Sequence, residues 1–226
     1  MMMLGSPEFW IGLLEIIGVN ILLSGDNAVV IALAARSLHG RRQKQAIIWG
    51  SVAAIVARVI LTVFAVELLK LPSLKIIGSL LLFWIAVKLL LPGKEDGNGI
   101  QGSNHLFSAI KIIVLADLVM SLDNVIGVAA AAKGNIILLI LGLAISIPLI
   151  IFGSTLILKL MQRFPVIITL GAALLGYIAG EMLVSDPLTI NWINNYANVL
   201  NLIVPITGAF FVVATGKWLN TLQHKA

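Results

Sequence analysis

Apolar stretches long enough to cross a lipid bilayer recur along this chain, and short polar segments separate them. A helix of about 20 residues rises roughly 30 Å, which matches the hydrocarbon core of a bilayer. The pattern therefore predicts membrane-spanning helices rather than the amphipathic helices of a water-soluble domain. We expect such helices at residues 9–35, 46–69, 73–91, 106–132, 135–158, 165–184 and 199–219. The predicted fold is an all-α polytopic membrane protein with seven transmembrane helices.

The composition agrees with this prediction and narrows the classes of function. Of the 226 residues, 60% are hydrophobic and only 11% are charged, and the mean hydropathy is +1.07. The chain contains no cysteine, which excludes disulfides, thiolate metal sites and redox pairs. The net charge of +5 fits the basic cytoplasmic loops of a membrane protein. We therefore expect contact with membrane lipid and no nucleic-acid partner.

Basic residues gather in alternate connections between the predicted spans. One side of the membrane receives Arg36, Arg41, Arg42, Lys44, Lys94, Lys111, Lys159, Arg163, Lys217 and Lys225. The opposite side receives only Lys70, Lys75 and Lys133. The side rich in lysine and arginine is normally cytoplasmic. We therefore expect a multi-pass protein of a bacterial-type cytoplasmic (inner) membrane, with its N-terminus outside and its C-terminus inside.

Two of the predicted spans repeat one pattern. Residues 17–36 read IGVNILLSGDNAVVIALAAR, residues 114–133 read VLADLVMSLDNVIGVAAAAK, and the two align without a gap. Serine, aspartate and asparagine recur in the same order, as Ser24, Asp26 and Asn27 and as Ser121, Asp123 and Asn124. In the same alignment Asn20 stands opposite Asp117. We call residues 24–27 the first motif and residues 121–124 the second motif.

A second alignment extends the repeat to further helices. Residues 71–91 match residues 164–184, with a proline and a glycine in equivalent places. Each repeat unit therefore holds three spans, and an odd number makes the second unit enter the membrane from the opposite side. Inverted repeats of this kind are a common plan of secondary transporters. We expect a first three-helix repeat at 1–91, a cytoplasmic linker at 92–105, an inverted repeat at 106–184, and an outer loop with a seventh helix at 185–226.

Charged and amide side chains inside the predicted spans are the candidates for a binding site, because ionisable residues within a membrane are rare and usually functional. The two motifs and their neighbours supply Asp26, Asp117, Asp123, Asn20, Asn27 and Asn124. Their oxygens suit a hard divalent cation such as Mn²⁺, Mg²⁺ or Ca²⁺, whose charge also offsets the cost of burying the acids. We expect a break in the helix at each motif, made easy by Gly25 in the first, so that the oxygens converge near the midplane.

Four further charged residues are candidates for a vestibule or a gate. Arg58 lies inside the second span, where a free guanidinium is costly, so we expect it to pair with a site carboxylate. Lys88 and Glu181 are equivalent in the second alignment. They are either partners across the repeat axis or residues that reach the interface at opposite faces. Glu15 shares a helical face with Asp26 and belongs either to a vestibule or to the interface.

The two motifs, on the first and fourth spans, resemble those of the TerC family of integral membrane proteins, and especially of its YjbE-type branch. The likeness covers essentially the whole chain, through both repeats and all seven spans. The resemblance implies metal-ion homeostasis, chiefly Mn²⁺ efflux, with Asp26, Asp117 and Asp123 as ligands and Mn²⁺ as a bound substrate rather than a cofactor. Many family members carry an acid six residues before the first motif aspartate, where this chain has Asn20.

These observations lead to one expected function and two alternatives. We expect a divalent metal-ion transporter that works by alternating access, with proton coupling open to test. It would not be an enzyme, and a homo-oligomer is compatible with the sequence. One alternative is a membrane assembly or metal-delivery factor without transport of its own. The other is an intramembrane aspartyl protease, which also places two aspartates on separate spans. Such proteases usually show Gly-x-Gly-Asp, and this chain has Leu23 at the first glycine.

Overall fold

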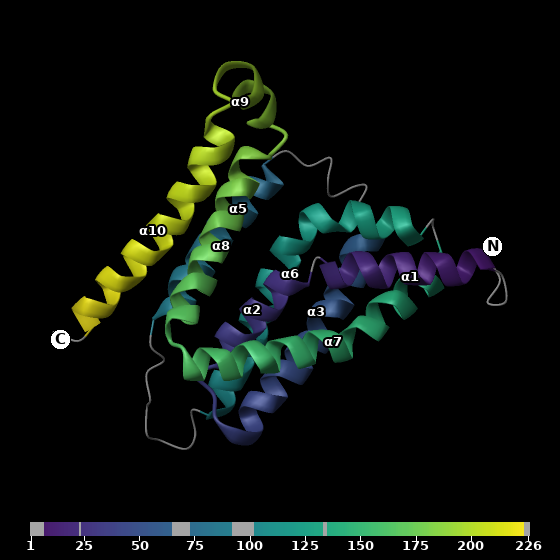
Figure 1. Ribbon diagram of the computed structural model, residues 1–226, viewed down its shortest axis with the longest axis horizontal. Helices are drawn as coiled ribbons and strands as arrows, with labels where there is room; N and C mark the ends of the chain where they lie inside the picture. The colour runs from purple at the N-terminus through teal and green to yellow at the C-terminus, as the bar shows by residue number, and fades with distance from the viewer. Residues whose placement is uncertain (1–6, 23, 65–72, 92–101, 133–134, 224–226) are drawn as a thin grey trace.

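The computed structural model describes residues 7–22, 24–64, 73–91, 102–132 and 135–223 (Figure 1). All regular secondary structure in these residues is α-helical. The helices are α1 (Pro7–Leu22), α2 (Gly25–Ala35), α3 (Gly40–Val63), α5 (Leu74–Leu90), α6 (Gly102–Ala132), α7 (Ile136–Arg163), α8 (Val166–Val184), α9 (Ile190–Tyr196) and α10 (Leu200–Gln223). The prediction of an all-α fold is confirmed.

The described helices include enough long apolar segments for several membrane crossings. Five of them are long and apolar enough to cross a membrane on their own, and six crossings result if α1 and α2 form one bent span. α5 has 17 residues and therefore rises about 26 Å, a little less than the thickness of a typical hydrocarbon core. The chain is thus a multi-pass integral membrane protein, and a seventh crossing by α5 stays a prediction.

Several helix ends, most clearly those of α3 and α7, and one short helix differ from the sequence prediction. α3 begins at Gly40, so Arg41, Arg42 and Lys44 lie on the helix and not in a loop. α7 continues to Arg163. The added turns carry exposed charged side chains, and hydropathy detects only the apolar part of such a helix. α9 forms in a segment predicted to be a loop.

The helices form two groups that lie beside each other (Figure 1). In the smaller group α5 and α10 both pack against α8, and α10 is the outermost helix in the view of Figure 1. In the larger group α3 packs along α6, while α7 packs against α1, α2 and α3. A continuous core of buried apolar side chains joins the two groups.

Glycines let helices of the larger group approach closely at two places. A Cβ atom at Gly50 of α3 would lie 2.6 Å from Ile113 Cδ1 of α6. A Cβ atom at Gly142 of α7 would lie 2.8 Å from Ile16 Cβ of α1. Small residues at helix crossings are typical of packing within membranes. Extending the repeat alignment by one residue makes Ile16 equivalent to Ile113, so each of these isoleucines meets a glycine of a neighbouring helix.

Asp186 ties the end of α8 to the start of α5. Its side chain is fully buried, and Oδ2 accepts hydrogen bonds from Lys75 N at 3.2 Å and Ile76 N at 3.3 Å. A carboxylate at a helix N-terminus satisfies N–H groups that lack a partner within the helix. Ser79 Oγ donates to Ala179 O at 2.6 Å. The two contacts together show that α5 and α8 run antiparallel.

Candidate functional site

Arg58 of α3 is the centre of a polar cluster between three helices. Its side chain is 2% exposed, and its guanidinium forms an ion pair with Asp117 of α6. Arg58 Nη1 also donates a hydrogen bond to Asn20 Oδ1 of α1 at 2.6 Å. Asn20 and Asp117 are themselves buried. Because a buried arginine needs a partner charge, the ion pair accounts for its position in an apolar span. We call these three side chains the Arg58 cluster.

Two serines extend the Arg58 cluster, one at Asn20 and one at Asp117. Ser24 Oγ donates to Asn20 Oδ1 at 3.5 Å, and Ser121 Oγ donates to Asp117 Oδ2 at 3.4 Å. In the repeat alignment Ser24 matches Ser121 and Asn20 matches Asp117, so equivalent residues make equivalent contacts. Arg58 therefore bridges two equivalent positions that differ by one negative charge.

Two hydrogen-bond donors of the Arg58 cluster find no acceptor in the described part of the chain. Among the described residues, none accepts a hydrogen bond from Asn20 Nδ2 or from Arg58 Nε. Ser51 Oγ, on the same face of α3, also has no partner within the described part of the chain. Static networks in proteins normally satisfy their buried polar atoms. These donors can therefore accept a further partner within the site. Sequence reasoning missed Ser51, because a serine is too common in membrane helices to stand out.

The first motif lies at the junction of α1 and α2, which are bent by 51° relative to each other. α2 begins at Gly25, so Asp26 stands in its first turn, where the helix dipole favours a negative charge. Asp26 Oδ1 accepts a hydrogen bond from Asn27 N at 2.8 Å. Asp26 is half-buried and follows Ser24 by two residues, and Ser24 contacts Asn20 of the Arg58 cluster. The predicted break at the first motif is confirmed.

The second motif has a different backbone, because α6 runs without interruption from Gly102 to Ala132. The predicted break at the second motif is therefore wrong. Leu122 stands where the first motif has Gly25, and leucine favours the helical conformation that glycine destabilises. The two halves of the site thus differ in backbone as well as in charge.

The two motifs lie at about the same level of the helix bundle. A Cβ atom at Gly12 of α1 would lie 3.7 Å from the carbonyl oxygen of Ala131, and one at Gly127 of α6 would lie 4.0 Å from Val19 Cγ1. α1 therefore runs antiparallel to the C-terminal half of α6. Following this register to the end of α1 at Leu22, just before the first motif, brings that end close to the second motif.

The remaining predicted ligands are described to different extents. Asn27 is buried in α2, and Asn124 is half-buried in α6. Asp123 belongs to α6, but its side chain lies outside the described part of the structure. Among the side chains that are described, no group of three His, Cys, Asp or Glu residues is arranged to hold a metal ion. A cage of three carboxylates formed by Asp26, Asp117 and Asp123 therefore stays a prediction.

Three charged residues predicted for a vestibule or gate lie away from the Arg58 cluster. Glu15 is exposed on α1, on the face that also exposes Ile11. Lys88 Nζ lies 4.8 Å from the centroid of the Trp84 ring. Because α5 and α8 are antiparallel, Lys88 near the end of α5 and Glu181 near the end of α8 lie at opposite ends of the pair. The interpretation of these two as partners is wrong, and their alternative placement at opposite faces agrees with the structure.

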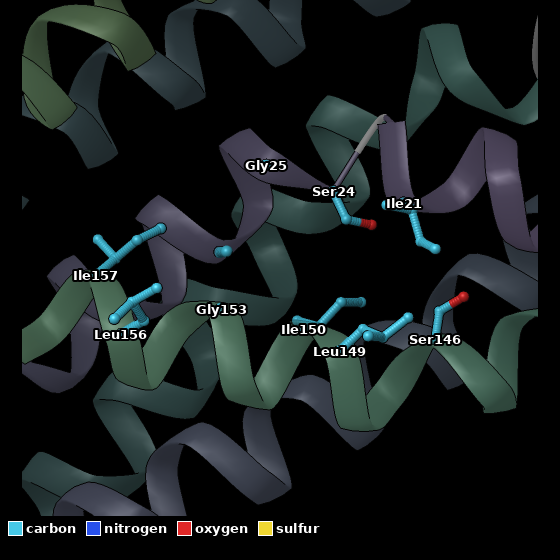
Figure 2. Close-up of a pocket in the computed structure, with 10 residues that line it drawn as sticks. Ile21, Ser24, Gly25, Ser146, Leu149, Ile150, Gly153, Leu156 and Ile157 are labelled. Atoms are coloured by element: carbon cyan, nitrogen blue, oxygen red, sulfur yellow. The ribbon is translucent and has the colours of Figure 1, made fainter.

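A cavity of about 250 Å³ opens between the first motif and α7 (Figure 2). Ser24 and Gly25 line it at the break between α1 and α2, and Ser146 and Gly153 line it from α7. Figure 2 shows that the serine hydroxyl groups are the polar side-chain atoms of an otherwise apolar wall. Since Ser24 also contacts Asn20, the cavity borders the Arg58 cluster on the side of α7.

A multi-pass helical fold with an ion pair buried in its interior defines a class of integral membrane protein that holds a polar site within the bilayer. Comparison with known families is more specific. The chain belongs to the TerC family of integral membrane proteins, whose sequence profile matches residues 5–224.

Several relatives are similar over most of the chain. The "Uncharacterized membrane protein YjbE" of Bacillus subtilis is 42% identical over 208 residues, which cover 92% of this chain and 95% of that protein. YceF of the same organism is 26% identical over 79% of this chain and 73% of its own length. YkoY is 24% identical over 76% of this chain and 59% of its own length. No solved structure matches. The predicted membership of the TerC family and the likeness to its YjbE-type branch are confirmed.

Proposed function

We propose that the protein exports divalent metal cations, chiefly Mn²⁺, from the cytoplasm by alternating access. The observation that carries this proposal is the buried pair of Asn20 and Asp117 around Arg58, with the half-buried Asp26 in the adjoining first motif. Carboxylate and amide oxygens are the ligands that hard cations prefer. Their burial within a membrane is costly unless a cation offsets their charge. Among hard cations, the resemblance to the TerC family favours Mn²⁺.

An inverted repeat of three plus three helices, followed by α10, is part of this proposal. The equivalent hydrogen bonds of Ser24 and Ser121 support it, as do the equivalent close contacts of Ile16 and Ile113. In such folds one repeat unit rocks against the other around a site near the midplane. The proposed orientation has the N-terminus outside, so that the basic start of α3 and the basic end of α7 face the cytoplasm.

Each site residue has a proposed role in the cycle. Asp117 and Asp26 supply two carboxylates that balance the charge of one dication, and Asp123 adds a third from the second motif. Asn20 supplies a neutral amide oxygen from the equivalent position to Asp117. Carboxylates exchange metal ions for protons, so we propose inward proton movement as the coupled step.

The protein is a carrier and not an enzyme in this proposal. In an aspartyl protease two carboxylates, here Asp26 and Asp123, would share one proton, but this chain has Leu23 in place of the first glycine of the Gly-x-Gly-Asp pattern. A metal-delivery factor shares the binding site but differs in one measurable property, because it binds the ion without moving it across the membrane.

Flux of Mn²⁺ into liposomes that contain the purified protein tests the proposal. The variants Asp26→Asn, Asp117→Asn and Asp123→Asn each remove one charge and keep the size of the side chain. Glu15→Gln is the matched control, since it removes an acid from α1 outside the Arg58 cluster. We expect the wild type and the control to carry Mn²⁺ and the three aspartate variants to lose most of the flux.

Other outcomes separate the alternatives. A wild type that binds Mn²⁺ but does not carry it would favour a metal-delivery factor. Cleavage of a peptide that depends on Asp26 and Asp123 would favour a protease. Normal flux in all three aspartate variants would show that the site lies elsewhere. Competition by Mg²⁺ and Ca²⁺ in the same assay measures the selectivity among hard cations.

A further inference from the structure

Arg58 holds the oxygens that the proposed function assigns to the transported ion. Its guanidinium contacts Asp117 and donates to Asn20 Oδ1 at 2.6 Å. A dication and a guanidinium repel each other at such short range, and strongly so in a low-dielectric interior. Binding of a metal ion at Asp117 therefore requires Arg58 to withdraw.

We propose that Arg58 is a tethered counter-cation that takes the place of the transported ion in the empty carrier, an inference that rests on the proposed function. A carrier changes its orientation twice in each cycle, once loaded and once empty. The metal neutralises the loaded site. Protons can neutralise the other carboxylates of the site on the return step, but without a substitute charge Asp117 would cross the membrane interior as an uncompensated carboxylate, which is costly. Arg58 supplies that charge, so the protein achieves net transport and not only exchange of one ion for another.

The way in which Arg58 is held suits a side chain that leaves and returns. It belongs to α3, whereas its partners Asn20 and Asp117 belong to α1 and α6, so it can withdraw without breaking either motif helix. Its Nε has no acceptor among the described residues, so the guanidinium is held through its terminal nitrogens Nη1 and Nη2. Thr62 Oγ1 donates to the Arg58 carbonyl oxygen at 2.8 Å, and contacts of this type loosen and bend a helix.

Arg58 has no equivalent in the second repeat. The two close glycine contacts pair Gly50 with Gly142, and the same offset pairs Arg58 with Ile150, which is buried in α7. Among the described residues, Arg58 is the one cation buried from solvent. The site is therefore built from two equivalent halves but contains one internal cation. Arg58 forms its ion pair with the half that bears the acid, Asp117.

Net uptake and exchange, measured in the same liposomes, test the inference. Net uptake is measured with Mn²⁺ on one side only. Exchange is measured with equal Mn²⁺ on both sides and radioactive Mn²⁺ as a tracer. We expect Arg58→Gln to keep most of its exchange but to lose net uptake by about a hundredfold, from the cost of one uncompensated buried charge. Because its internal competitor is gone, this variant should also bind Mn²⁺ more tightly than the wild type. Arg58→Lys keeps the charge and should recover much of the net uptake.

Each result has a distinct meaning. Arg58→Gln overturns the inference if it keeps net uptake, or if net uptake and exchange fall together. A wild type that carries no Mn²⁺ in either assay refutes the proposed function instead. If Arg58→Gln does not fold, an experimental structure of the wild type with bound Mn²⁺ decides the matter. Separation of Arg58 from Asp117 supports the inference, and an intact pair beside a metal ion on Asp117 overturns it.

Discussion

The ion pair between Arg58 and Asp117 allows a stability test that needs no transport assay. The two side chains are 2% and 8% exposed. Arg58→Gln or Asp117→Asn removes one partner and leaves the other charge buried. In proteins this change costs about 3–5 kcal/mol of unfolding free energy, more than the pair itself contributes.

The remaining contacts rank the two variants. Without Arg58, Asp117 keeps the hydroxyl of Ser121 at 3.4 Å. Without the Asp117 charge, Arg58 keeps the shorter contact with Asn20 Oδ1 at 2.6 Å. We therefore expect a loss of about 4 kcal/mol for Arg58→Gln and about 3 kcal/mol for Asp117→Asn. The double variant buries no charge, so it should lose only about 2 kcal/mol, or about 5 kcal/mol less than the sum of the single losses.

The unfolding free energies are measured by denaturant titration of the purified variants in detergent micelles. Asp186→Asn, combined with Arg58→Gln, is the control, because Asp186 shares no partner with the Arg58 cluster and the two losses should add. If each single variant loses less than about 1 kcal/mol of unfolding free energy, the pair behaves like a solvent-exposed one. That result would contradict the burial of Arg58 and Asp117. A double variant that loses as much as the sum of the single variants would show that the two residues are not coupled.

Three further changes test other parts of the structure. Asp186→Ala should lower the unfolding free energy by about 2 kcal/mol, because it removes the acceptor at the start of α5. Asp186→Asn keeps an acceptor oxygen and should cost less. Equal losses in the two variants would argue against this capping role. Gly142→Ala should cost about 2 kcal/mol and Gly50→Ala about 1 kcal/mol or less, because the added methyl meets the branched Cβ of Ile16 in one case and the flexible end of an isoleucine in the other. The reverse order in thermal unfolding would contradict the packing. Glu15→Gln should leave Mn²⁺ flux near the wild-type value, and a large loss would place Glu15 in the ion pathway.

The sequence predicts best the features that depend on neighbours along the chain. The all-α fold follows from hydropathy, because a backbone within lipid must satisfy its hydrogen bonds inside each helix. The break at Gly25 follows from the weak helix preference of glycine. The same reasoning fails at the second motif, where it expects a break in spite of Leu122. The same reasoning also starts α3 too late and ends α7 too early, because charged turns extend each helix beyond its apolar part.

Contacts between distant segments are a different kind of problem. The second alignment makes Lys88 and Glu181 equivalent, but equivalence in a repeat is not proximity. The antiparallel packing of α5 and α8 separates them. Asp186 shows the opposite failure, since no local pattern indicates that an acid after α8 caps the start of α5. Backbone N–H groups exist at every helix start, so the sequence does not say which side chain reaches them.

By itself, the sequence determined that this chain spans a membrane, that it carries two related motifs, and that an arginine buried in a span needs an acidic partner. It did not determine which acid that partner is. Arg58 lies 38 residues from Asn20 and 59 residues from Asp117 along the chain, so no helical spacing relates them. The choice depends on how closely α3 packs along α6, where Gly50 leaves room for Ile113. Tertiary packing alone therefore decided that the guanidinium bridges two equivalent positions of the two repeats.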